Sequence, residues 1–232
     1  MAVTVITGGA GHLGQALVAR AVARGDETHI VDVSPRVTDI AASLGATGHR
    51  VDMTNADEVA TLAVLPRVDR LICGVGAWPR IPWTELTPER WNSLVSLNLT
   101  SAFLAVSTLT KALMSASGSV VLVGSAIALK GNPEMAHYAA AKAGLIGMAK
   151  SLALSLGPAG VRVNVVAPGL IETPDADHTW TLEDRQKMWN QRALRRALTV
   201  DEVADPIDFL SGALSSGITG QTLVVDGGIV LH

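Results

Sequence analysis

The chain has 232 residues, 48% of them hydrophobic, and a formal net charge of −3. Its single cysteine, Cys73, excludes an intrachain disulfide, and 18 Lys plus Arg against 21 Asp plus Glu leave no basic surplus for nucleic acid. The first residues lack the basic start of a signal peptide, and no unbroken apolar run reaches the roughly 18 residues of a membrane span. We therefore expect a cytoplasmic protein with no nucleic-acid or membrane partner.

Short β-branched apolar runs alternate along the chain with longer stretches rich in alanine and leucine. The short runs predict strands at Val3–Thr7, His29–Val33, Leu71–Val75, Ser119–Gly124, Arg162–Ala167 and Leu223–Val225. The longer stretches predict helices at Leu13–Arg24, Ala56–Ala63, Pro88–Ser115, Tyr138–Leu156 and Val200–Leu214. This alternation is typical of an α/β fold, a doubly wound, mainly parallel sheet with helices on both faces, of the Rossmann type. No repeat or linker marks a boundary, so one domain is expected over 1–232.

One region, at about 170–199, breaks the alternation. It carries Trp180, Met188 and Trp189 among many charged residues. Following the fifth predicted strand, it is expected at the carboxyl edge of the sheet, where ligands of such folds bind. An apolar side facing a substrate predicts a lid over an apolar or cyclic compound. Packing onto the protein body is the alternative.

A glycine-rich turn follows the first predicted strand and opens the first helix. Gly9, Gly11 and Gly14 satisfy G-x-G-x-x-G, and Gly8 precedes them. Such a turn lets the main chain approach a pyrophosphate and directs the amides of a helix N-terminus at its charge. The position after the first strand favours a dinucleotide over an ordinary turn.

Two carboxylates follow predicted strands or extended segments. Asp32 lies 18 residues beyond Gly14, where a carboxylate accepts hydrogen bonds from ribose hydroxyls and repels a 2′-phosphate. This predicts NAD, with NADP the less favoured cofactor, although Arg36 is a nearby cation that suits a 2′-phosphate. Asp52 precedes Thr54, an expected helix cap, so its alternatives are a turn carboxylate and a contact to adenine.

Tyr138, the only tyrosine, lies four residues before Lys142 in a helix-forming segment. Residues i and i+4 share a helix face, so we expect the ammonium near the phenol, where a cation lowers the phenol pKa from about 10. Ser125, at the end of a predicted strand, is expected to place a substrate oxygen at Tyr138. By itself Tyr-x-x-x-Lys is also compatible with an exposed helix face.

Taken together, these motifs resemble the short-chain dehydrogenase/reductase family over nearly the whole chain. The resemblance rests on the glycine turn, Asn98 in Leu97–Leu99, Ser125, Tyr138 with Lys142, the segment Asn164–Gly169 followed by Thr173, and Val225–Gly228. It implies that Ser125 orients the substrate and Tyr138 is the general acid/base. Lys142 would bind the nicotinamide ribose and tune Tyr138, and Asn98 would hold a water. It also implies a homo-oligomer, a tetramer or dimer.

The same resemblance implies a set of cofactor contacts. They are Gly8, Gly11, His12, Leu13, Gly14, Asp32, Asp52, Met53, Gly74, Gly76, Tyr138, Lys142, Pro168, Gly169, Ile171 and Thr173. His12 replaces a usual glycine, and Cys73–Gly76 departs from the usual Asn-Asn-Ala-Gly. These departures leave two alternatives to an NAD-dependent secondary-alcohol dehydrogenase or ketone reductase: a catalytically silent dinucleotide sensor or scaffold, and epimerase or dehydratase chemistry.

Several other residues have ordinary structural interpretations. His137 is adjacent to Tyr138 but about 100° around the helix. Cys73 is expected to be a buried strand residue. For Trp78, Trp83 and Trp91 we expect core or subunit packing, with the pocket wall as the alternative. No His, Cys or carboxylate cluster has metal-ligand spacing, so no metal is expected.

Overall fold

The structure, a computed structural model, describes residues 1–174 and 180–231. One parallel sheet of seven strands runs in the order β3-β2-β1-β4-β5-β6-β7. The strands are β1 Val3–Thr7, β2 Glu27–Asp32, β3 Thr47–Arg50, β4 Arg70–Cys73, β5 Ser119–Val123, β6 Arg162–Pro168 and β7 Thr222–Val225. The strand order reverses between β1 and β4, so a crevice opens at their carboxyl ends. The predicted α/β, doubly wound fold is confirmed.

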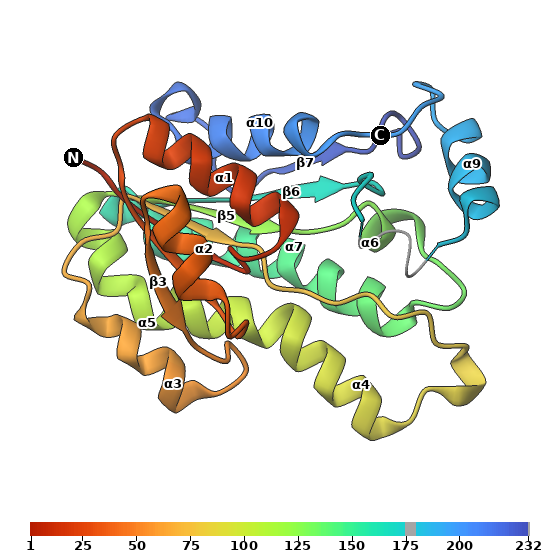
Figure 1. Ribbon diagram of the computed structural model, residues 1–232, viewed down its shortest axis with the longest axis horizontal. Coiled ribbons are helices and arrows are strands. Elements are labelled where there is room, and N and C mark those ends of the chain that lie inside the picture. Colours follow the sequence, from red (N-terminus) through yellow and green to blue (C-terminus); the bar gives the residue numbers. More distant parts are fainter. Residues whose placement is uncertain (175–179, 232) are drawn as a thin grey trace.

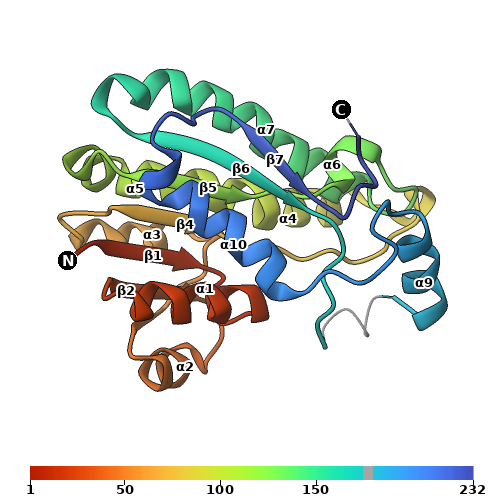
Figure 2. The ribbon, with the colours of Figure 1, turned by 90° about the horizontal axis from the view of Figure 1, so that it is seen from above.

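Helices cover both faces of this sheet (Figures 1 and 2). One face buries α1 His12–Ala23, α2 Val37–Leu44 and α10 Val200–Ser211 against the sheet, and the other buries α3 Ala56–Ala60, α5 Ser101–Ala116 and α7 Ala136–Leu156. Helix α4 (Pro88–Val95) runs into α5, while α6 (Ile127–Lys130) and α9 (Leu182–Asn190) lie beyond the carboxyl ends of the strands (Figure 1). Short turns of helix span Thr61–Val64, Trp83–Glu85, Gly157–Ala159 and Ala213–Ser215. The two hydrophobic layers leave the carboxyl edge of the sheet for the site.

Four elements with a label in Figure 1 or 2 were not predicted from the sequence: strand β3 and the helices α2, α6 and α9. Helix α2 has only eight residues, and β3 consists of Thr-Gly-His-Arg, with no large apolar side chain. An edge strand has one neighbour and carries polar residues, so β3 lacks the apolar run by which a central strand is recognised. The predicted helix Pro88–Ser115 is also not regular, because a π-helical turn at Ser96–Thr100 separates α4 from α5.

Two helical stretches are apolar enough, by length and composition alone, to span a bilayer. They are Pro88–Ala116 and Ala136–Ala159, with mean hydropathies of 1.4 and 1.2. Neither is an unbroken apolar run, which explains why counting such runs did not identify them. Ala102, Ala105 and Leu109 of α5, and Leu145 of α7, are buried in the core beside the sheet. Packing against the sheet therefore accounts for part of their apolar composition, since about a third of each window is buried.

Candidate active site

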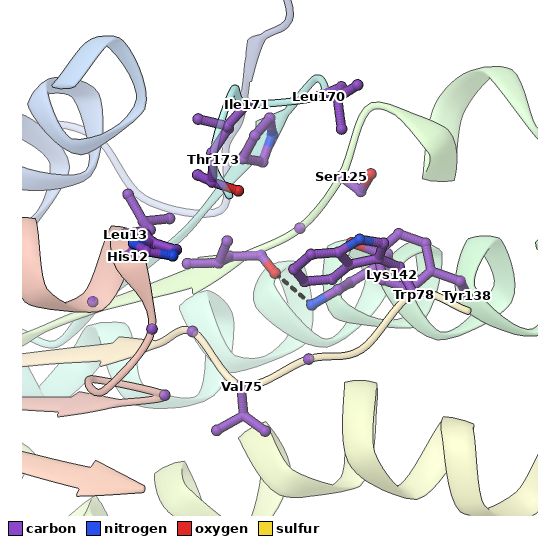
Figure 3. Close-up of a pocket in the computed structure, with 18 of the residues that line it drawn as sticks. His12, Leu13, Val75, Trp78, Ser125, Tyr138, Lys142, Leu170, Ile171 and Thr173 are labelled. Carbon is purple, nitrogen blue, oxygen red and sulfur yellow. Dashed lines mark hydrogen bonds between the residues drawn. The ribbon is translucent and has the colours of Figure 1, made fainter. Parts of the chain in front are cut away.

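A cavity of about 590 Å³ lies at the carboxyl edge of the sheet. Every residue predicted to contact the cofactor lines it, as do Ser125, Tyr138 and Lys142; Asn98 alone of the predicted site residues does not. Figure 3 shows His12 and Leu13 on one side of this space, Ser125 and Tyr138 on the other, and Ile171 and Thr173 between them. The sequence-predicted residues are thus brought together, although their individual roles remain predictions.

The glycine turn provides a cradle made of main chain. Gly8 has φ +71° and passes so close to β4 that a Cβ would lie 2.8 Å from the Gly74 carbonyl carbon. At Gly14 a Cβ would lie 2.5 Å from Gly9 Cα, and nearer still to the Gly8 carbonyl oxygen. Helix α1 begins after Gly11 with no side-chain cap. The positive end of the helix therefore faces the cavity, and the cradle fits a dinucleotide pyrophosphate.

Asp32 ends β2 beside this turn. One carboxylate oxygen accepts a hydrogen bond from the Ala10 amide at 3.0 Å, and the other accepts from the Ser34 amide at 3.0 Å. The carboxylate is therefore held rigidly at the rim of the cavity. A fixed negative charge at this place opposes a second negative group nearby.

Asp52 also lines the cavity, with Met53 buried next to it. Its Oδ1 accepts from both the amide (2.8 Å) and the hydroxyl (2.7 Å) of Thr54, which lowers the carboxyl pKa. The expectation that Thr54 caps the following helix is wrong, because Asn55 is the N-cap of α3. Asp52 thus forms a turn and also lines the cavity, and the contact to adenine stays a prediction.

Ser125, Tyr138 and Lys142 meet where β5 ends and α7 begins. Ser125 follows β5 and accepts a hydrogen bond from the Ile127 amide at 3.2 Å. Lys142 Nζ donates to the Val123 carbonyl at 2.8 Å, the dashed line in Figure 3, and lies 5.6 Å from the centroid of the Tyr138 ring. All three side chains are more than nine-tenths buried. One helical turn therefore brings an ammonium and a phenol to the same strand end.

Burial dominates the electrostatics of this group. It raises the pKa of the Tyr138 hydroxyl to about 12, against the opposing effect of the Ser125 side chain. Burial also lowers the pKa of Lys142 to about 8. The expected lowering of the phenol pKa by Lys142 is not seen in this structure: burial raises the pKa, Ser125 is the group that opposes it, and the Lys142 ammonium donates its hydrogen bond to Val123. At neutral pH the phenol keeps its proton and is ready to donate it.

Asn98 acts on the main chain around the cavity. It lies in the π-helical turn, 1% exposed. Its Nδ2 donates to the carbonyls of Ala77 and Leu94, both at 2.9 Å, and its Oδ1 accepts from the Ala77 amide at 3.2 Å. The side chain therefore ties the segment after β4 to the helix. The predicted water-holding role stays a prediction, since both of its amide hydrogens already have main-chain partners.

The predicted insertion contributes helix α9 and part of the cavity wall. Its residues 175–179 lie outside the described residues. Trp180 is buried with Met135 and Tyr138, and Met188 of α9 packs against them. Both line the cavity, whereas Trp189 does not.

An arginine from another segment holds this wall in place. The guanidinium carbon of Arg80 lies 4.7 Å from the centroid of the Trp180 ring, and the same side chain pairs with Glu134 at 2.5 Å and with Asp184 at 3.3 Å. The segment after β4, the loop before α7 and the start of α9 are therefore joined at a single side chain. This junction sits directly behind the apolar wall of the cavity.

Several cavity residues escaped the sequence analysis. They are Ile127, Lys130, Asn132, Met135, Leu170, Arg192 and Ile229. Nothing in the sequence marks Arg192 as a cavity residue, because it stands close to Arg195 and Arg196 in a stretch that is typical of a solvated surface. Only the fold reveals that Arg192 is buried while those two are exposed.

The aromatic and histidine assignments had mixed outcomes. None of Trp78, Trp83 and Trp91 is in the buried core, and Trp78 forms part of the cavity wall. His137 is buried outside the cavity, and burial lowers its pKa. Cys73 is a buried strand thiol, as expected, and burial raises its pKa to about 12.

A family model described as enoyl-(acyl carrier protein) reductase matches residues 9–230. The chain belongs to the short-chain dehydrogenase/reductase family. A crystal structure of an oxidoreductase of that family from Burkholderia thailandensis superposes with a TM-score of 0.91, at 33% identity, over 99% of this chain and 92% of the other. The resemblance inferred from the motifs is confirmed, and the chain is an oxidoreductase by family.

Named relatives differ in substrate. The 3-oxoacyl-[acyl-carrier-protein] reductase FabG of Salmonella typhimurium is 33% identical over 99% of this chain and 97% of its own length. The cis-4-hydroxycyclohexanecarboxylate dehydrogenase of Sinomonas cyclohexanicum is 33% identical over 97% of this chain and 95% of its own length. An uncharacterized short-chain type dehydrogenase/reductase of Sinorhizobium fredii is 37% identical, but the chain spans only 43% of its length. Family membership therefore leaves the substrate open.

Proposed function

We propose that the protein is an NAD-dependent oxidoreductase that interconverts a secondary alcohol and a ketone on a small apolar or cyclic substrate. The observation that carries this proposal is the meeting of Ser125, Tyr138 and Lys142 in the same cavity as an uncapped, glycine-lined helix start. Bound there, a nicotinamide dinucleotide supplies or accepts the hydride. The relatives' names, which include a 3-oxoacyl substrate and a hydroxycyclohexane acid, support chemistry at a carbonyl or hydroxyl.

The side chains divide the proton chemistry. In reduction, the Ser125 hydroxyl orients the substrate carbonyl, and Tyr138, protonated at neutral pH, donates its proton to that oxygen. In oxidation the same phenol oxygen takes the proton of the substrate alcohol. Lys142 positions the ribose and offsets the negative charge that develops on the phenol. Asp32 disfavours a 2′-phosphate, which supports NAD over NADP.

Replacing Tyr138 tests this assignment. The variant Tyr138→Phe should lower turnover of secondary alcohols at least about 1000-fold, because the proton-transfer group is gone. Its affinity for NADH, measured by fluorescence titration, should stay within about threefold of wild type. Absorbance at the NADH band gives the rate. Near-normal turnover in this variant would contradict the role of Tyr138, and no cofactor reduction with any alcohol in the wild type would favour a silent dinucleotide-binding protein.

We also propose a cytoplasmic homo-oligomer, a dimer or tetramer, that acts on a small molecule and has no nucleic-acid or membrane partner. The exposed apolar side chains of Phe103 and Met114 on α5 and Leu154 on α7 support association through these helices. Light scattering of wild type and Leu154→Glu tests it: the variant should shift toward smaller species.

A further inference from the structure

Arg192 is a buried cation at the substrate end of the cavity. It follows α9, is 2% exposed and lines the cavity. Nη1 donates to the Arg196 carbonyl at 2.6 Å, and Nη2 donates to the Leu170 carbonyl at 2.6 Å. A guanidinium has five N–H donors, and Nε has no partner. Arg192 therefore keeps unused hydrogen-bonding capacity beside the site.

The carboxylates around Arg192 have other partners. The charges of Asp226, Glu172 and Glu202 reach it, but both oxygens of Asp226 accept main-chain amides of residues 228–230. Glu172 and Glu202 each pair with a different arginine, and Oε2 of Glu172 is buried without a hydrogen-bond partner. Within 1–174 and 180–231, no ion pair includes Arg192. A buried charge without a partner is unfavourable, so a ligand that brings a negative group would stabilise it.

Charge is distributed unevenly along the cavity. The carboxylates among the lining residues, Asp32 and Asp52, both stand at the nucleotide end, after β2 and β3. The other end has the buried Arg192 and Lys142 and the exposed Lys130. Within the described parts of the chain, no acidic residue lines this end. A cationic end of this kind favours an anionic substrate.

The surroundings of Arg192 also indicate the rest of the substrate. Leu170, whose carbonyl accepts from Arg192, packs against the cluster that contains Tyr138 and Trp180. Met135, Met188 and Ile127 complete this apolar wall. The guanidinium thus stands next to a hydrophobic surface that leads to the phenol. Together, the hydrophobic surface and the cation favour a substrate with an apolar body and one negatively charged end.

We propose that Arg192 binds a carboxylate of the substrate, and that the substrate is a hydroxy acid or keto acid whose carboxylate and reacting carbon are separated by an apolar ring or chain. This inference rests on the proposed function, because it names the substrate class of the same site. Arg192 would hold the carboxylate while Ser125 and Tyr138 hold the alcohol or ketone oxygen at the other end. Lys130, at the mouth, adds a weaker attraction.

Matched acids and amides test the inference. Binding of cyclohexanecarboxylate and of cyclohexanecarboxamide is measured by calorimetry on protein saturated with NADH. Turnover is measured with 4-hydroxycyclohexanecarboxylate and its carboxamide. Wild type should prefer the acid in both assays. In Arg192→Gln the acid should lose about 10- to 100-fold in affinity and in kcat/KM, while the amide changes less than about threefold. Arg192→Lys should recover part of the preference, and the exposed Lys150→Gln should change nothing.

Each outcome decides a separate point. Equal binding of acid and amide by the wild type would overturn the inference and leave the proposed function standing. Equal loss for acid and amide in both Arg192 variants would reduce Arg192 to a structural support and overturn it as well. A tenfold loss of NADH affinity without a change in acid preference would assign the guanidinium to the dinucleotide, against the inference. Acid-selective binding without turnover of either alcohol would support the anion site and contradict the proposed function.

Discussion

The two ends of the cavity are built in different ways. At the nucleotide end, the turn between β1 and α1 consists of main chain, and the constraints are close main-chain approaches, within the turn at Gly14 against Gly9 and across to the end of β4 at Gly8 against Gly74. At the substrate end, side chains arrive from segments distant in sequence: Arg80 contacts Trp180 and Asp184. The first end depends on the absence of side chains, and the second depends on the burial of particular ones. Substitutions should therefore damage the two ends in different ways.

The largest effect is expected from Gly14→Ala. The new Cβ would meet main-chain atoms of residues 8 and 9, which cannot move aside as a side chain can. Affinity for NADH should fall at least about 100-fold, and overpacking should lower the free energy of unfolding by about 1–3 kcal/mol. Fluorescence titration and urea unfolding measure both. The control is Gly147→Ala, in α7, where a Cβ meets nothing within 4 Å. Tight cofactor binding by Gly14→Ala would contradict the main-chain cradle.

A change of charge at the nucleotide end should have the next largest effect. In Asp32→Ala the ratio of kcat/KM with NADP to kcat/KM with NAD should rise about 10- to 100-fold, because a fixed carboxylate no longer repels the 2′-phosphate. Steady-state rates with each cofactor give the ratio. Asp39→Ala, an exposed carboxylate on the neighbouring helix α2, serves as the control. An unchanged ratio in Asp32→Ala would remove the basis for preferring NAD.

At the substrate end, the buried ammonium should cost stability. Burial lowers the pKa of Lys142 from 10.5 to about 8, so between these pH values the unfolded chain binds more protons than the folded one. The contribution of Lys142 to the free energy of unfolding should therefore rise with pH across that window, and its cost is fully present below pH 8. At pH 7, the free energy of unfolding of Lys142→Met should exceed that of the wild type by about 1–2 kcal/mol. This figure includes the loss of the hydrogen bond to Val123.

Urea unfolding at several pH values measures this effect. The advantage of Lys142→Met over wild type should shrink as the pH rises from about 8 toward 10.5. Lys150→Met, at an exposed position on the same helix, should show no such trend. Parallel pH profiles for wild type and Lys142→Met would show that the ammonium is better solvated than its burial implies.

The smallest effect is expected from Arg80→Gln. This change removes the cation above the Trp180 ring and two ion pairs that are each about one-third exposed. Partly exposed pairs contribute little, so KM for the alcohol should rise only about two- to fivefold, with NADH affinity unchanged. Arg67→Gln, which breaks a pair with Asp69 at the far edge, should alter neither value. A change in NADH affinity would show that the two ends are coupled.

The same contrast explains what could be predicted from the sequence. The glycine turn, Asp32 and the spacing of Tyr138 and Lys142 are local patterns, so they were recognised together with the central strands. The identity of Arg192 as a buried residue depends on Leu170 and on residues 227–228, which the fold brings to it. The predicted direction of the Tyr138 pKa shift was wrong for a related reason. Desolvation comes from everything packed around a group and not from its helical neighbour alone.

The π-helical turn at Ser96–Thr100 has a further consequence for the evolution of the chain. A π turn holds one residue more than an α-helical turn, and each residue advances an α-helix by about 100°. Removing one residue there would restore an ordinary α-helical turn and leave Trp91 and the rest of α4 nearly in register with Ala102 and Ala105, which the core holds against the sheet. A deletion elsewhere between Pro88 and Ala116 would instead rotate one part of the stretch by about 100° relative to the other, so the π turn is the place where a change of one residue should be tolerated best.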